Sequence, residues 1–155
     1  MEGKKSILVI DDEPNNFEVI EILLFKEGYN LNGVCSGYAA LNYLETHKPD
    51  VILLDVMMPD LDGIEVCRRI KTNPEWQHIP VIMVTALDSK EDLAQCLEAG
   101  ADDFVSKPVN GVEIRARVRS MLRIKQQYDD LQASLQLRED LANMVVHDLR
   151  NPLAN

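Results

Sequence analysis

The chain has 155 residues, 46% of them hydrophobic and 27% charged, which is enough for one domain with an addition. Its formal net charge of −10 argues against electrostatic binding to nucleic acid. Three widely spaced cysteines without a C-x-x-C pair, no signal-peptide pattern and no apolar run of membrane-helix length predict a cytoplasmic protein with reduced thiols and no membrane span.

The charge is unevenly distributed along the chain. Residues 1–109 contain 9 basic and 20 acidic residues, a net charge of −11, whereas residues 110–155 contain 7 and 6, a net charge of +1. This change predicts a boundary of function near Asn110.

Apolar runs alternate with stretches of helical periodicity. The runs predict strands at residues 5–10, 31–35, 50–55, 80–85 and 103–106. The periodic stretches predict helices at residues 15–27, 37–47, 63–71, from an N-cap at Ser89 to residue 99, and 112–151. Strand and helix alternating five times predict an α/β fold, a parallel sheet with helices on both faces.

Four of the predicted strands end in a polar residue that does not fit an apolar run. These residues are Asp11 with Asp12, Asp55, Thr85 and Lys107. One aspartate at a strand end is usually a turn or cap residue, but the carboxyl ends of parallel strands meet at one edge, where open α/β sheets bind ligands. The joint occurrence on four strands therefore predicts a single pocket.

The pocket predicted in this way has the groups needed for phosphoryl transfer. Carboxylates that repel one another require a cation, and an all-oxygen site suits Mg²⁺. Asp55 follows the buried run V-I-L-L and is the candidate nucleophile. Lys107 supplies a positive charge and Thr85 a hydroxyl donor for the phosphoryl oxygens.

The motifs around these residues resemble the receiver domain of bacterial two-component response regulators over about residues 4–122. The resemblance rests on Asp11-Asp12-Glu13-Pro14, Leu54-Asp55 with Met58-Pro59 and Asp62-Gly63, Val84-Thr85-Ala86, and E-A-G-A-D-D-F at residues 98–104 ahead of Lys107-Pro108.

The resemblance implies a flavodoxin-like (βα)₅ doubly wound sheet of strand order 2-1-3-4-5 in residues 1–122. It implies that Asp55 accepts a phosphoryl group from a phosphohistidine of a histidine kinase or histidine phosphotransfer protein. It also implies a cis Lys107–Pro108 bond, with Lys107 and Thr85 on the phosphoryl oxygens. The implied Mg²⁺ ligands are Asp12, Asp55 and the Met57 backbone carbonyl, with Asp11 acting mainly through water.

The family's conformational switch couples Thr85 to an aromatic residue, here Phe104 next to the small Ala86. A plain core role for Phe104 is the alternative interpretation. Met57 and Leu87 flank the expected phosphate and cannot orient a water molecule, so we expect slow self-dephosphorylation.

Residues 112–151 contain no Gly or Pro, so helical sequence continues for roughly 60 Å. An apolar seam at alternating steps of four and three, imperfect at Arg138, predicts a parallel coiled-coil homodimer through residues 112–151. A second stripe at Leu137, Leu141 and Met144 favours a four-helix bundle. The seam consists of Ile124, Tyr128, Leu131, Leu135, Arg138, Ala142, Val145 and Leu149.

The end of this helix, from His147-Asp148 to Pro152, resembles the H-box of histidine kinases. The resemblance implies that His147 is a second phosphoacceptor beside Asp148. The chain has no ATP-binding motifs, so we expect no kinase activity from these residues. We expect residues 123–155 to begin the kinase core of a longer hybrid sensor kinase; a stand-alone regulator or adaptor with a coiled-coil tail is the alternative.

Two other classes of function use similar residues. An aspartyl-phosphate phosphohydrolase of the haloacid-dehalogenase type needs a second Asp two residues after its nucleophile, where this chain has Met57. A flavin carrier of similar topology binds phosphate after its first strand, where Asp11, Asp12 and Glu13 would repel it.

Overall fold

The computed structural model describes residues 3–86 and 89–150. Five parallel strands form one sheet in the order β2-β1-β3-β4-β5, which confirms the predicted flavodoxin-like arrangement. The strands are β1 (Ser6–Ile10), β2 (Asn30–Val34), β3 (Val51–Asp55), β4 (Val81–Thr85) and β5 (Asp103–Ser106). The helices are α1 (Pro14–Leu24), the 3₁₀ turn η1 (Phe25–Glu27), α2 (Gly37–Leu44), α3 (Gly63–Thr72), α4 (Lys90–Glu98) and α5 (Gly111–Arg150).

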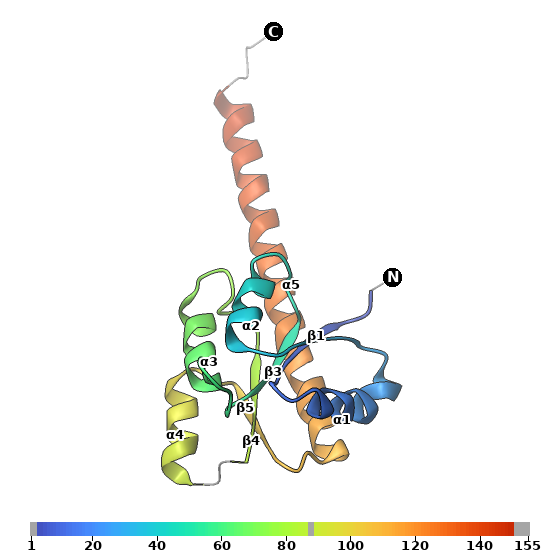
Figure 1. Cartoon of the computed structure of the whole chain (residues 1–155). Coiled ribbons are helices and arrows are strands. Elements are labelled where there is room, and N and C mark those ends of the chain that lie inside the picture. The colour runs from blue at the N-terminus through green and yellow to red at the C-terminus, as the bar shows by residue number, and fades with distance from the viewer. Residues whose placement is uncertain (1–2, 87–88, 151–155) are drawn as a thin grey trace. The chain divides into compact units, whose positions relative to one another are not determined.

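The strands bury both faces, and alternate residues belong to two separate hydrophobic clusters. In β1, Ile7 and Val9 pack with residues of α1 and α5, whereas Leu8 and Ile10 pack with residues of α2, α3 and α4. The same two groups of helices are visible on opposite faces of the sheet (Figure 1). Burial of each aliphatic side chain contributes roughly 1.5–3 kcal/mol to the stability of the fold. These two clusters therefore hold the strands, and the residues at their ends, in fixed positions.

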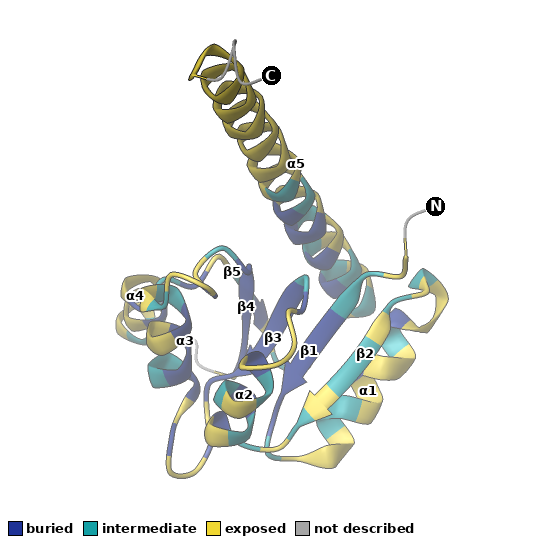
Figure 2. Ribbon diagram, turned by 90° about the horizontal axis from the view of Figure 1, so that it is seen from above, coloured by how far each residue is buried: buried dark blue, intermediate teal, exposed yellow. Residues whose placement is uncertain are grey.

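Exposure varies across the sheet. All five residues of β3 and of β4 are buried, whereas the edge strand β2 is half-buried to exposed (Figure 2). Continuous apolar sequence is what a strand covered on both faces requires. The carboxylate at the end of β3 therefore lies at the centre of the sheet's edge rather than at its rim.

Two helices are shorter than the sequence predicted. The helix expected to reach residue 27 ends at Leu24 and continues as a 3₁₀ turn, after which Gly28 adopts a left-handed conformation with φ 76°. The helix expected to reach residue 47 ends at Leu44. Pro49 follows soon after, and the residue that precedes a proline disfavours the helical conformation. The helix therefore ends before it reaches the proline. The N-cap at Ser89 is confirmed, because its hydroxyl accepts a hydrogen bond from Asp92 N.

The chain divides into two compact units, with the boundary between Lys125 and Gln126. The first unit contains the sheet and the part of α5 whose side chains are buried, the last of them Lys125. In the second unit, residues 131–150 of α5 are all exposed (Figure 2). Across residues 3–86 and 89–150, no helix is both long enough and apolar enough to cross a membrane.

Candidate functional site

The structure brings together the carboxylates that follow β1 and end β3. One oxygen from each of Asp11, Asp12 and Asp55 lies within 4.8 Å of the others. Asp55 is only 4% exposed and Asp11 is also buried, while Asp12 is half-buried. The predicted convergence of these residues at one edge of the sheet is therefore observed.

Asp11 is held in place by groups at the start of α1. Its Oδ1 accepts a hydrogen bond of 2.9 Å from Glu13 N, and Asn16 Nδ2 lies 3.2 and 3.0 Å from its two oxygens. Pro14 begins α1, which turns the backbone so that Asn16 faces back toward the strand end. Asn16 was not among the residues predicted from the sequence. The available signal was an amide in the first helical turn after a carboxylate pair.

Lys107 lies directly after β5 and reaches across to β3. Its Nζ is 3.0 Å from Asp55 Oδ1 and 3.8 Å from Asp11 Oδ2. Its backbone N donates to Thr85 O at 2.9 Å, which fixes the end of β5 against the end of β4. The Lys107–Pro108 peptide bond is cis, as predicted. The one cation of the predicted set therefore contacts two of the three carboxylates.

The pKa of Asp55 is raised above its ordinary value. Burial is the largest cause, and the negative charge of Asp11 raises the pKa further. The hydrogen bond and charge of Lys107, together with a hydrogen bond from Met57 N, act in the opposite direction. Asp55 is thus a buried anion that needs positive charge beside it.

Three further residues were predicted to belong to the site. The sequence predicts that Thr85 contacts the phosphoryl oxygens, and that it forms a switch with Phe104, next to Ala86. Thr85 ends β4 and is 1% exposed, whereas Ala86, the next residue, is exposed. Phe104 pairs with Met83 on the neighbouring strand and packs, partly buried, against the cluster under α2, α3 and α4. These contacts are those of a core residue that also lies one strand from Thr85.

The loop after β3 places Met57 beside Asp55. Met57 N donates to Asp55 Oδ1 at 3.4 Å, and the residue is 64% exposed. The second apolar residue expected near the phosphate, Leu87, lies outside the described residues.

A cavity of about 420 Å³ borders the acidic group. Its lining includes Asp11, Asn16 and Lys107 on the polar side and Val19 and Val109 on the apolar side. The site is therefore open to a ligand with both a charged and an apolar part.

The donor set fits a hard divalent cation. Three carboxylates within 4.8 Å of one another supply only oxygen ligands, which is the preference of Mg²⁺. Their mutual repulsion, visible in the effect of Asp11 on the pKa of Asp55, is the force that such a cation would relieve.

His147 belongs to the second unit. Its side chain is 75% exposed, and its Nδ1 lies 3.7 Å from Asp148 Oδ1. The remaining part of the predicted H-box, Asn151 and Pro152, lies outside the described residues.

Residues 7–119 match the family model described as "Response regulator receiver domain". Response regulator PleD from Caulobacter vibrioides is 46% identical over 125 residues, which cover 81% of this chain and 28% of PleD. The alkaline phosphatase synthesis transcriptional regulatory protein PhoP from Bacillus subtilis is 43% identical over 119 residues, 77% of this chain and 49% of PhoP. The chain thus spans between about a quarter and a half of these relatives.

Solved structures of histidine kinase receiver domains are also similar. The signal receiver domain of a signal transduction histidine kinase from Syntrophus aciditrophicus has a TM-score of 0.73 and 37% identity, covering 77% of this chain and 90% of that one. The receiver domain of sensor histidine kinase PA1611 from Pseudomonas aeruginosa PAO1 has a TM-score of 0.71 and 32% identity, covering 77% and 98%. The latter structure has a magnesium ion coordinated in its active site cleft.

Proposed function

This chain belongs to the response regulator receiver domain family, and from that premise we propose that it is the phosphoacceptor of a two-component phosphorelay. Asp55 is the residue that receives the phosphoryl group. The observation that carries this assignment is the contact between Lys107 Nζ and Asp55 Oδ1, at 3.0 Å, inside a group of three carboxylates. A buried carboxylate of this kind is a nucleophile with a cation ready beside it.

In the proposed reaction, a carboxylate oxygen of Asp55 attacks the phosphorus of a phosphohistidine on a histidine kinase or histidine phosphotransfer protein. The new O–P bond forms as the P–N bond breaks, and the imidazole of the donor keeps the electron pair. Lys107 supplies positive charge to the phosphoryl oxygens, and the Thr85 hydroxyl donates to them. The cavity beside the site, with Val19 and Val109 on its apolar side, gives the imidazole a place to approach.

We assign Mg²⁺ to the acidic group, held by Asp12, Asp55 and the Met57 backbone carbonyl. Asp11 acts mainly through water, because Glu13 N and Asn16 already donate to its oxygens. When bound, the ion supplies positive charge to the transferring phosphoryl group. The magnesium in the similar PA1611 receiver supports this assignment.

The test is phosphorylation of the full chain by acetyl phosphate with Mg²⁺, followed by mass spectrometry of the intact protein. We expect one added phosphoryl group, none after Asp55→Asn, and a rate reduced about 100-fold or more after Lys107→Ala. Asp60→Asn is the matched control, because Asp60 lies in the same loop, is exposed, and has a φ of 67° that Asn tolerates. Undiminished labelling of Asp55→Asn would refute the assignment.

We further propose that Thr85 and Phe104 form the switch that responds to phosphorylation, next to the small Ala86. Phe104 lies on β5, adjacent to β4, and its partial burial leaves the ring a second position to occupy. If Phe104 is only a core residue, Phe104→Leu changes stability without changing the response of Thr85 amide signals to phosphorylation.

We propose that residues 112–151 carry a parallel homodimer. The described seam residues from Leu131 to Leu149 are exposed and apolar apart from Arg138, which supports a partner helix on this face. Two Arg138 side chains would face each other in such a dimer, so Arg138→Leu should tighten it about tenfold. Ala133→Leu, on the opposite face, is the control, and sedimentation velocity is the measurement. A monomer at every concentration would refute the dimer.

We propose that residues 123–155 start the kinase core of a hybrid sensor kinase, with His147 as a second phosphoacceptor. The exposed imidazole beside Asp148 supports this. A stand-alone regulator with a coiled-coil tail is the competing function. The full gene product should acquire an acid-labile, alkali-stable label from ATP that His147→Gln removes. The competing function predicts no such label.

A further inference from the structure

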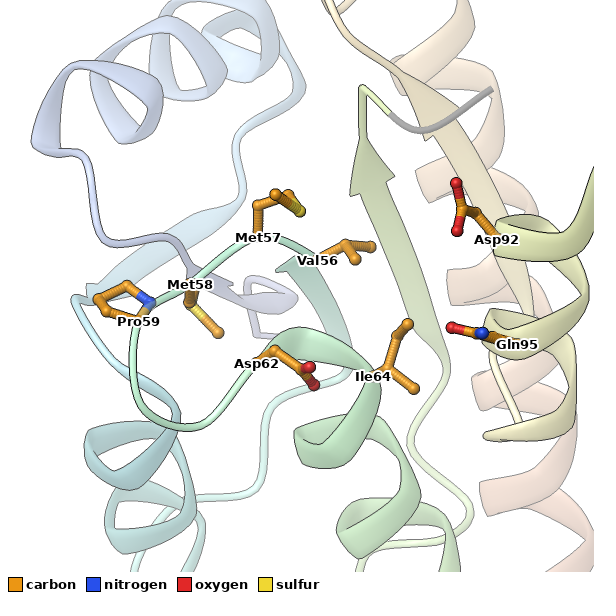
Figure 3. A pocket seen from close by; sticks show the side chains of 8 residues that line it. All are labelled: Val56, Met57, Met58, Pro59, Asp62, Ile64, Asp92 and Gln95. Carbon is orange, nitrogen blue, oxygen red and sulfur yellow. The ribbon is translucent and has the colours of Figure 1, made fainter. Parts of the chain in front are cut away.

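A second cavity, of about 540 Å³, lies between the loop after β3 and helix α4. Figure 3 shows it from close by. Its lining combines an apolar wall with polar groups at α3 and α4, and it shares Met57, but none of the three carboxylates, with the proposed Mg²⁺ site. The lining residues that matter here are Val56, Met58, Asp62, Ile64, Asp92 and Gln95.

Two of the polar groups of this cavity, Asp62 and Asp92, are acidic, and each is held by a hydrogen bond at the start of its own helix. Asp62 caps α3, its Oδ1 accepting from Glu65 N at 2.9 Å, and Asp92 Oδ2 accepts from Ser89 Oγ at 2.6 Å. Asp92 and Gln95 project from α4 toward the loop that carries Asp62 (Figure 3). None of the described residues that line the cavity is basic. This part of the lining therefore presents negative charge beside an apolar wall.

The charges of Asp62 and Asp92 both act on the side chain of Cys96. Burial raises the pKa of the Cys96 thiol on α4, and the charges of Asp92 and Asp62 raise it further. Two anions whose charges reach the same thiol create a shared region of negative potential. A single cationic side chain can interact with both of them there.

The wall of the cavity is tied to the phosphoacceptor. Val56 N donates to Val84 O at 3.3 Å, Gly63 N donates to Val56 O at 2.9 Å, and Met57 N donates to Asp55 Oδ1 at 3.4 Å. The same short segment of backbone thus contacts Asp55, forms the cavity wall and pairs with β4. These bonds connect Asp55 with the wall of the cavity.

We propose that this cavity binds a segment of a partner protein that presents an arginine or lysine beside aliphatic side chains. The cation lies between Asp62 and Asp92, and the aliphatic groups pack on Met58 and Ile64. Charge complementarity selects this occupant over an acidic or purely apolar one. Because a phosphoryl group adds negative charge near the cavity, phosphorylation of Asp55 strengthens the binding; this second part rests on the proposed function.

The test is a titration of the ¹⁵N-labelled full chain with a short helical peptide of alanine, leucine and arginine, at constant Mg²⁺. We expect amide shifts at residues 56–64 and 90–95. The double variant Asp62→Asn with Asp92→Asn should bind roughly tenfold more weakly, since two exposed ion pairs are lost. Asn still caps α3 at position 62, and Ser89 remains the N-cap of α4, so both helices persist.

The matched control is Glu91→Gln, which removes one negative charge from α4 at a residue outside the lining. It should leave the affinity unchanged. A peptide with glutamate in place of arginine should not bind. Equal affinity of the double variant, binding of the glutamate peptide, or shifts confined to other residues would overturn the proposal. So would a change in self-association without peptide binding, which would place a second copy in the cavity.

The second part is tested by repeating the titration after adding beryllofluoride, with Mg²⁺ unchanged. We expect affinity to rise roughly fivefold, at the low end of coupling between two sites, and Asp55→Asn to abolish the rise. If acetyl phosphate labels Asp55 but the affinity does not change, the coupling is wrong and the proposed function stands. If Asp55 is never labelled, the proposed function fails while the unphosphorylated titration still decides the cavity.

Discussion

At the scale of single residues, Asp55 combines burial with charge. Its carboxyl group is 4% exposed, and its pKa is raised above the ordinary value, with burial as the largest cause. An acid whose pKa is raised on folding stabilises the protein only at low pH, and this stabilisation is lost as the pH rises through the raised pKa. At neutral pH the ionised Asp55 therefore opposes folding when no metal is present.

This predicts that Asp55→Asn stabilises the metal-free protein. At neutral pH we expect a gain of about 1 kcal/mol in the free energy of unfolding, the usual scale of one substitution. The gain should disappear as the pH falls below 3.8, the ordinary pKa of the group, because the carboxyl group is then protonated in both the folded and the unfolded state. Urea denaturation in a chelating buffer at several pH values measures the difference. A variant less stable than wild type at neutral pH would contradict it.

Addition of Mg²⁺ should make the wild-type protein more stable than Asp55→Asn. A ligand that binds only the folded state at ten times its Kd raises stability by about 1.4 kcal/mol. Wild type should gain this amount, and Asp55→Asn less, because one proposed ligand has lost its charge. The measurement is thermal unfolding across a Mg²⁺ series, with Ca²⁺ and with salt of equal ionic strength as controls. If Mg²⁺ raised the stability of both proteins equally, Asp55 would not be a ligand of the metal.

At the scale of elements, the turn from β3 into α3 is tightly packed against the strand. A Cβ atom on Gly63 would lie 2.1 Å from Asp55 O and 2.8 Å from Val56 Cα, both backbone atoms that cannot move aside alone. The glycine thus lets α3 begin directly against the strand that carries the phosphoacceptor. Its role is close approach of backbone to backbone.

Gly63→Ala should therefore damage both stability and phosphorylation. We expect a loss of about 2–3 kcal/mol, since overpacking a rigid site typically costs up to this amount. The rate of Asp55 phosphorylation should fall as well, because the loop holding Met57 N must shift. Gly3→Ala is the control, since no atom lies within 4 Å of a Cβ at that position. Chemical denaturation and acetyl phosphate labelling are the measurements, and a neutral Gly63→Ala would contradict the packing argument.

The sequence predicted the strands better than the helix ends and the site's supporting residues. Strands buried on both faces appear as unbroken apolar runs, so the runs of β3 and β4 also located Asp55 and Thr85. Asn16 was missed because its contact with Asp11 depends on the direction of the first turn of α1. The cavity beside α4 depends on how the side chains of α3 and α4 are spaced, which no periodicity encodes.

At the scale of the whole molecule, α5 belongs partly to the receiver and partly to the second unit. The family match ends at residue 119, but buried residues continue along α5 to Lys125, where the boundary between the units lies. The sequence motifs predicted this boundary at residue 122, and we propose that the receiver extends to Lys125. The last turns of the buried part include Val118, Met121 and Leu122, which belong to the core cluster under α1 and α5.

Two shortened chains test this boundary. A chain ending at Lys125 keeps every buried residue of α5, so it should unfold at nearly the same denaturant concentration as the full chain and accept a phosphoryl group at the same rate. A chain ending at Arg117 loses four buried side chains, and the three apolar ones each contribute roughly 1.5–3 kcal/mol to stability, so it should lose roughly 5 kcal/mol. That loss equals the whole stability of a marginal domain. If both chains fold equally well, the buried end of α5 is not part of the receiver, and the boundary lies before Val118.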